Sequence, residues 1–153
     1  MTNTNTPAGN ISAAPRYKAR WLTVCGFLMA MNTVLSSFNI PVPGGHFYLN
    51  DVIIVAAALS LDPLGSFLVG GVGAFLGDFF FYPLPMFVSL ATHGVEAVVI
   101  SLFARRYGKK NLPLTFFGVF LGALIVVIGY SLGRAYVYST PEYSLIKLPF
   151  EIL

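Results

Sequence analysis

Charged residues are scarce in this chain of 153 residues: 10% are Asp, Glu, Lys or Arg, against about 25% in soluble domains. Hydrophobic residues make up 56% of the chain and aromatic residues 15%, and the mean hydropathy is +0.77. Such a chain lacks the polar surface that would cover a globule in water. The composition therefore predicts an integral membrane protein and leaves no room for a separate soluble domain.

Cysteine and histidine are also scarce, with one Cys (Cys25) and two His beside six Asp and Glu. A single cysteine excludes a disulfide framework or a cysteine-based metal cluster within the chain. No Walker loop, Ser–His–Asp set or pair of catalytic carboxylates stands out in the sequence. The sequence therefore predicts no cofactor, no metal site and no ATPase site.

Apolar runs separated by Pro, Gly and polar residues predict six helices, at residues 21–38, 52–61, 64–81, 86–103, 114–132 and 143–153. The second run covers only about half of a bilayer at about 1.5 Å per residue, so it needs extension by the preceding loop, 39–50, or shielding by other helices. The sixth run is too short to span. We expect an all-α, six-helix transmembrane bundle whose sixth helix is truncated in this chain, preceded by a disordered cytosolic tail at residues 1–15.

The basic residues predict the orientation. With the amino terminus in the cytosol, seven of the nine Lys and Arg residues fall on the cytosolic side, as the positive-inside rule requires. This distribution explains the net charge of +3 without a nucleic-acid partner. It describes a multi-pass protein of the cell membrane whose outer loops are residues 39–50, 82–85 and 134–142.

Three ionisable residues lie in or at the ends of the predicted spans: Asp78, His93 and Glu96. Each costs at least about 2.5 kcal/mol at membrane depth unless it is paired or hydrated. His93 and Glu96 are three residues apart and therefore share a helix face. They form either a structural pair inside the bundle or the wall of a polar ligand site.

The outer loops favour the ligand site, because their polar groups would ring an outward-facing cavity with His93 and Glu96 at its floor. Tyr48, Tyr82 and Arg134 are the side chains expected at this rim. Cavities with aromatic walls and a few polar groups suit a planar, polar small molecule. Asn50 and Asp51 could instead cap the second helix, since Asn and Asp favour that position.

Small residues four apart recur in the predicted spans, as Gly73-x-x-x-Gly77, Gly118-x-x-x-Gly122 and Gly129-x-x-x-Gly133. Such pairs let helix backbones approach closely, and we expect them to pack helices within this chain. Gly26 and Ala30 form a similar pair on the first span, which could be a docking face for another membrane subunit.

Several stretches, taken together, are similar to the substrate-binding (S) components of energy-coupling factor (ECF) vitamin transporters, in particular to the riboflavin-type branch. These stretches are Ile40–Gly45 through Asn50-Asp51, Asp62–Gly65, Gly70–Gly73 with Gly77-Asp78, Thr92–Glu96 and Ile146–Phe150. The resemblance extends over nearly all of residues 21–153. One departure concerns the run His93-Gly94-Val95-Glu96-Ala97, where many relatives read Lys-Gly-x-Glu-Gly. A contact that depends on a fixed cation in relatives becomes pH-dependent here or is lost.

The resemblance implies a single transmembrane substrate-binding domain over residues 16–153, with a vitamin site that opens outward under a lid formed by the first loop. It implies as partners a water-soluble vitamin, a membrane scaffold subunit, two cytosolic ATPases and the lipid bilayer. In the family, small residues of the first helix meet the scaffold, a role that Gly26 and Ala30 would take here. On this interpretation we expect ligand contacts from Asn39, Tyr48, Asn50, Asp78, His93, Glu96 and Arg134.

Two other functions remain open at this point. One is a small membrane-embedded, metal-dependent enzyme using His46, Asp78, His93 and Glu96. The other is a structural membrane partner without a ligand, in which the His–Glu pair only determines packing.

Overall fold

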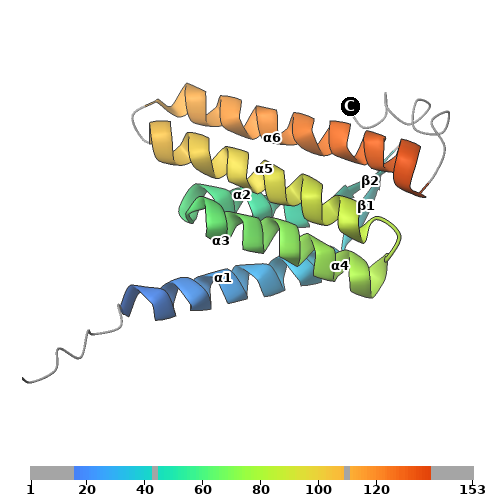
Figure 1. Cartoon of the computed structure of the whole chain (residues 1–153), viewed down its shortest axis with the longest axis horizontal. Coiled ribbons are helices and arrows are strands. Elements are labelled where there is room, and N and C mark those ends of the chain that lie inside the picture. Colours follow the sequence, from blue (N-terminus) through green and yellow to red (C-terminus); the bar gives the residue numbers. More distant parts are fainter. Residues whose placement is uncertain (1–15, 43–44, 109–110, 139–153) are drawn as a thin grey trace, which may run out of the picture.

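The computed structural model describes residues 16–42, 45–108 and 111–138. Its long helices lie side by side with roughly aligned axes (Figure 1). In chain order the elements are α1 (Arg16–Leu35), β1 (Asn39–Val42), β2 (Gly45–Tyr48), α2 (Asn50–Ser60), α3 (Pro63–Phe67), the π-helical η1 (Leu68–Val72), α4 (Gly73–Phe81), α5 (Met86–Tyr107), α6 (Leu112–Gly133) and the π-helical η3 (Arg134–Tyr138). The predicted all-α membrane fold is confirmed, with one small hairpin added.

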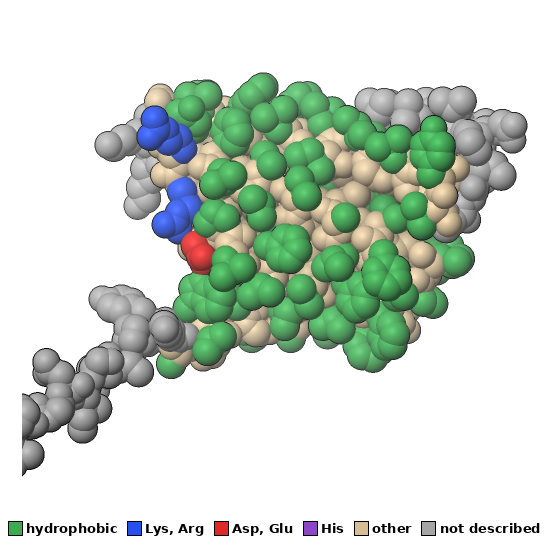
Figure 2. All heavy atoms as spheres, in the orientation of Figure 1, with side chains coloured by type: hydrophobic (Ala, Val, Ile, Leu, Met, Phe, Trp, Pro, Cys, Tyr) green, Lys and Arg blue, Asp and Glu red, His purple; other side chains and the backbone are tan. Residues whose placement is uncertain are grey.

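Three segments are long and apolar enough to cross a membrane: Pro63–Phe81, Met86–Tyr107 and Leu112–Val137. Shorter apolar helices occupy Ala19–Leu35 and Asn50–Ser60. Large apolar side chains cover much of the face seen in Figure 2, which suits contact with lipid rather than with water. The predicted tail at residues 1–15 and the predicted sixth helix at residues 143–153 lie outside the described residues.

Helix α5 is the central helix, because it contacts α2, α3, η1, α4 and α6. Ile54 and Ala58 of α2 pack against Ala97 and Ile100 of α5 and form a fully buried core cluster. A second cluster joins α1, α2 and η1 around Cys25. The short α2 is thus shielded by its neighbours, as its length requires.

Residues 39–50, predicted as a loop, contain an antiparallel hairpin. Asn39 pairs with Tyr48, and Val42 pairs with Gly45 next to the turn. The pairing satisfies backbone groups that an irregular loop would leave to water, and β2 leads through Leu49 into α2.

The two ends of the bundle differ in composition. The hairpin lies at the same end as the turn between α4 and α5 and the carboxyl end of α6 (Figure 1). We call this the hairpin end. On the face shown in Figure 2, the Lys and Arg side chains gather at the opposite end, where α5 ends and α6 begins.

Side chains of α1 hold the π-helical segment η1 and the start of α4. Asn32, which is fully buried, donates from Nδ2 to the carbonyl oxygen of Val69 at 2.6 Å. Thr33 donates from its hydroxyl to the carbonyl oxygen of Gly73 at 3.1 Å. Backbone carbonyls displaced from regular α-helical bonding need such partners inside a membrane.

Glycines let η1 touch the backbone of α5. A Cβ atom on Gly70 would lie 2.8 Å from the carbonyl oxygen of His93, and one on Gly71 would lie 2.9 Å from that of Leu90. Only a residue without a Cβ fits at these two points. The contact with η1 therefore fixes the position of α5 at the level of His93.

The predicted small-residue pairs also pack within the chain, which confirms that interpretation. A Cβ on each of these glycines would collide with a side chain of a neighbouring helix: Gly73 with Asn32, Gly77 with Ser36, Gly118 with Phe103, Gly122 with Ile100, Gly129 with Thr92 and Gly133 with Val88.

The substitution Gly70→Ala tests the backbone contact. We expect it to destabilise the protein by about 1–3 kcal/mol, because the added methyl meets a backbone oxygen that cannot turn away. Melting temperature in mild detergent measures the effect. Gly26→Ala is the matched control, since a Cβ there has nothing within 4 Å; equal melting temperatures for the two variants would contradict the contact.

Candidate functional site

His93 and Glu96 form a buried pair on α5. His93 Nδ1 lies 2.8 Å from Glu96 Oε2, and each side chain is only 6% exposed. The predicted sharing of one helix face is therefore confirmed. Two ionisable groups brought to this depth must satisfy each other or find further polar partners.

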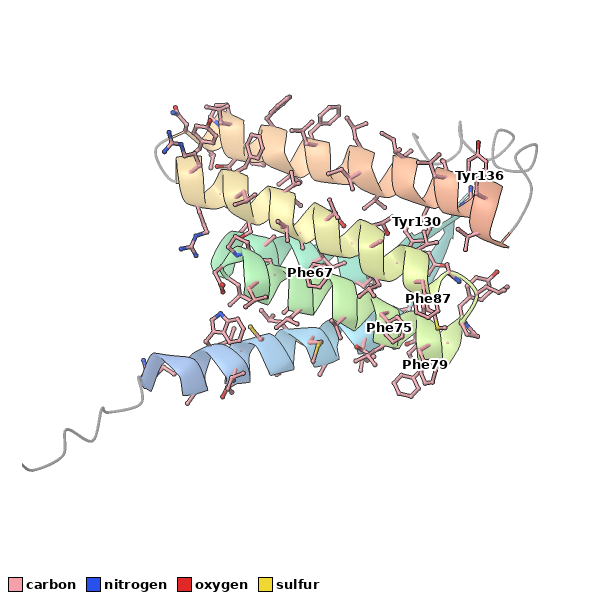
Figure 3. The ribbon with its side chains drawn as sticks, viewed as in Figure 1. Phe67, Phe75, Phe79, Phe87, Tyr130 and Tyr136 are labelled. Carbon is pink, nitrogen blue, oxygen red and sulfur yellow. The ribbon has the colours of Figure 1, made fainter. Side chains whose placement is uncertain are left out.

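Tyr130 and Ser89 extend this pair to α4 and α6. Tyr130, which points from α6 toward α5 in Figure 3, places its hydroxyl 3.2 Å from His93 Nε2. The same hydroxyl lies 2.5 Å from the Ser89 hydroxyl, and Ser89 in turn donates to Asp78 of α4. One chain of hydrogen bonds thus runs from Asp78 to Glu96 across three helices.

The directions of these bonds follow from the available protons. The Ser89 hydroxyl donates its single proton to Asp78, so the Tyr130 hydroxyl must donate to the Ser89 oxygen. The Tyr130 oxygen then accepts from His93 Nε2. One further proton lies between His93 Nδ1 and Glu96. Every donor in this chain is therefore used inside it.

Helix α2 brings Asp51 to the same place. Asp51 Oδ1 lies 3.8 Å from His93 Nδ1, and the Asp51 side chain is 40% exposed. The polar cluster is therefore buried at His93 and Glu96 and reaches the surface at Asp51. We use the name acceptor cluster for Asp51, Asp78, Ser89, His93, Glu96 and Tyr130.

Asn50 is buried next to this cluster. It is 5% exposed and shares the buried stripe of α2 with Ile54, which packs against Ala97. Helices α2 and α5 both begin at the hairpin end and run in the same direction. Asn50 precedes Ile54 by one helical turn, and His93 precedes Ala97 by one turn, so Asn50 lies at the level of His93. The Asn50 side-chain oxygen has no hydrogen-bond partner among the described residues.

The alternative role of Asn50 and Asp51 as helix caps is wrong. The N-cap of α2 is Leu49, and within the described chain this helix start has no side-chain cap hydrogen bond. Both side chains therefore remain available to the site.

The remaining predicted rim residues also lie at the hairpin end. Partial burial, Asp78 and Tyr82 raise the pKa of the Tyr48 phenol, so Tyr48 keeps its proton at neutral pH. Tyr82 is exposed in the turn after α4. Arg134 begins η3, one turn beyond Tyr130.

The side chains of Asn39 and His46 lie outside what the structure describes. Of the predicted ligand residues, the structure brings Asn50, Asp78, His93 and Glu96 together. It also adds Asp51, Ser89 and Tyr130, which were not predicted as ligand contacts. Ser89 had a local signal, because it precedes His93 by one helical turn. For Tyr130 the sequence signal was weaker: an aromatic residue with a polar hydroxyl near the end of a helix.

The described residues contain no group of three or more His, Cys, Asp and Glu side chains that could hold a metal ion. The hydrogen bonds of the cluster instead form a continuous polar wall. Such a wall inside an apolar bundle is suited to orienting a small polar molecule.

The family model described as ECF-type riboflavin transporter, S component, matches residues 16–152 of the chain. A search among curated proteins found no match. The matched range contains the acceptor cluster and all the described elements.

Removing the bridging hydroxyl with Tyr130→Phe tests the network. We expect a loss of about 1–3 kcal/mol in the free energy of unfolding, because His93 and Ser89 each lose a buried partner. Thermal unfolding in detergent measures it. The control is Tyr136→Phe, whose ring points away from the bundle and is 78% exposed (Figure 3); an equal effect of the two substitutions would refute the network.

Proposed function

The chain belongs to the S components of ECF-type riboflavin transporters, and on this premise we propose that it captures a water-soluble vitamin or vitamin precursor at the acceptor cluster. An S component is a vitamin-uptake subunit and not an enzyme. The vitamin enters at the hairpin end, passes to a membrane scaffold subunit and is released inside by the work of two cytosolic ATPases.

The acceptor cluster carries this proposal. It joins ionisable side chains of α2, α4 and α5, together with Tyr130 of α6, at one end of the bundle. Each ionisable group there costs about 2.5 kcal/mol or more at membrane depth. Packing alone would be achieved more cheaply by apolar side chains, so the cluster is better explained by a ligand.

The distribution of charge supports entry from outside. Basic side chains gather at the end of the bundle opposite the hairpin (Figure 2), and such clusters face the cytosol. The hairpin end then faces outward, with the amino terminus in the cytosol. Asp51, whose side chain is 40% exposed, would meet the incoming ligand before the buried His93 and Glu96.

The scaffold subunit is proposed to dock on α1, along the face that carries Gly26 and Ala30. Trp21 and Asn32 bind α1 to the bundle from its other side, through Asp62 at 2.5 Å and Val69. Gly26 and Ala30 are exposed, and a Cβ on Gly26 would have nothing within 4 Å. A second helix could therefore approach this backbone closely.

Glu96→Ala tests the ligand site. Riboflavin, thiamine, pyridoxine and pantothenate are each added to the purified protein, and the melting temperature identifies the binder, since a ligand at 100 times its Kd stabilises by about 2.7 kcal/mol. We expect Glu96→Ala to weaken binding of that vitamin by about 1.5–3 kcal/mol, or roughly 10- to 150-fold in Kd.

Val95→Ala, at the neighbouring exposed position of α5, is the control for this measurement and should leave Kd unchanged. Equal Kd values for Glu96→Ala and the unaltered protein would remove Glu96 from the site. A complete panel without stabilisation would contradict vitamin binding by these compounds.

Gly26→Leu tests the docking face. We expect the variant to lose co-purification with the co-expressed scaffold and ATPase subunits, because a leucine side chain keeps the two helices apart. Its ligand-induced shift in melting temperature should stay unchanged, since Gly26 is remote from the cluster. Ala123→Leu, an exposed small residue of α6, is the matched control. Undiminished co-purification of Gly26→Leu would place the scaffold elsewhere.

A further inference from the structure

The acceptor cluster offers acceptors to a ligand but no spare donor of its own. The protons of Ser89, Tyr130 and His93 are all used in the chain that ends at Asp78 and Glu96. Each of these two carboxyl groups has a second oxygen beyond the bonded one. A ligand that reaches the cluster therefore meets oxygen lone pairs.

Asp51 adds an acceptor that points into the cluster. Its Oδ1 atom is buried, lies 3.8 Å from His93 Nδ1 and has no hydrogen bond to any described residue. At 3.8 Å the contact with His93 is an ion-pair distance and not a hydrogen bond. Burying a carboxylate oxygen without a hydrogen-bond donor costs free energy, so this atom can accept a hydrogen bond from a ligand.

Asn50 is a second, independent sign of a ligand. Asn50 is only 5% exposed and lies at the level of His93. Its side-chain oxygen has no hydrogen-bond partner among the described residues. Buried side-chain amides in native proteins are nearly always hydrogen-bonded. The amide oxygen can therefore accept a hydrogen bond from a ligand donor.

Carboxyl groups outnumber basic groups among the described residues of this region. The described elements that meet here contribute three carboxyl groups, Asp51, Asp78 and Glu96, and two basic groups, His93 and Arg134. Tyr48 keeps its proton and adds no charge. Among the described residues, three carboxyl groups therefore face two basic groups at this site.

We propose that the bound ligand presents a cationic or amine-bearing nitrogen edge to Asp51, Asp78, Glu96 and Asn50, so that this S component takes an amine-bearing heterocyclic vitamin or precursor. The proposal rests on the proposed function and specifies its substrate class. N–H donors on a positive nitrogen form charge-assisted hydrogen bonds with carboxylates, which are about twice as strong as neutral ones.

The same geometry disfavours two other classes of ligand. A carboxylate-bearing compound would bring a further acidic group among three carboxyl groups at low dielectric. A ring whose polar edge consists mainly of carbonyl oxygens would set acceptors against the carboxyl oxygens of Asp51, Asp78 and Glu96. A metal ion is no substitute, since the described residues hold no group suited to one.

Matched compounds test the class. Pyridoxamine and pyridoxine differ by an amine in place of a hydroxyl, thiamine carries an aminopyrimidine and a cationic ring, and riboflavin and pantothenate represent the disfavoured classes. Kd is measured for each on the full-length protein in detergent. We expect pyridoxamine or thiamine to bind at least about 10-fold more tightly than pyridoxine, riboflavin and pantothenate.

Asp51→Asn provides the variant, because it removes the charge, keeps the shape and lies at a partly exposed position. It should raise the Kd of the amine-bearing compound by about 10-fold or more and change the Kd of the other compounds by less than about 3-fold. Val52→Ala, the next and exposed residue of α2, is the control and should change neither.

The outcomes separate the two proposals. Tighter binding of riboflavin, pyridoxine or pantothenate would overturn the amine preference and keep the protein a vitamin binder. An amine-bearing binder whose Kd is indifferent to Asp51→Asn would also overturn it. Absence of binding by all five compounds would contradict both the substrate class and the vitamin-binding role.

Discussion

The backbone contact between η1 and α5 is the constraint on which the rest of the structure depends. Gly70 and Gly71 bring η1 so close to α5 that a methyl group on either would strike a carbonyl oxygen. In lipid the hydrophobic effect does not press helices together, so close packing and polar contacts must do so. Asn32 completes the arrangement from α1 by donating to the carbonyl of Val69. The position of α5 against η1 then determines where His93 lies.

The acceptor cluster follows from this placement and makes the hairpin end different from the rest of the bundle. Helices α2, α4 and α6 each bring a polar side chain to the chain of contacts that contains His93 and Glu96 of α5, and the donors inside this chain are taken up by its own acceptors. Among the oxygens without a hydrogen bond to any described residue are Oδ1 of Asp51 and Oδ1 of Asn50. A binding subunit needs such an imbalance, because a fully satisfied network has nothing to offer a ligand.

Ligand capture and partner docking are assigned to different parts of the same small bundle. The ligand site lies at the hairpin end, whereas the exposed small residues Gly26 and Ala30 lie on α1, on the side that is not bound to the core. Because α1 also holds η1 through Asn32, it contacts the segment that seats α5. This continuity offers a physical route by which docking and the ligand site could affect one another.

The sequence by itself determined the membrane class, the positions of five helices and the pairing of His93 with Glu96. These features are local: hydropathy is read residue by residue, and a spacing of three places two side chains on one helix face. Only the tertiary structure decided that Asp51, Ser89 and Tyr130 join them, that residues 39–48 pair as strands and that Asn50 is buried rather than a cap. These contacts link separate elements, and their geometry depends on how closely the glycines let the helices approach, which no local pattern encodes.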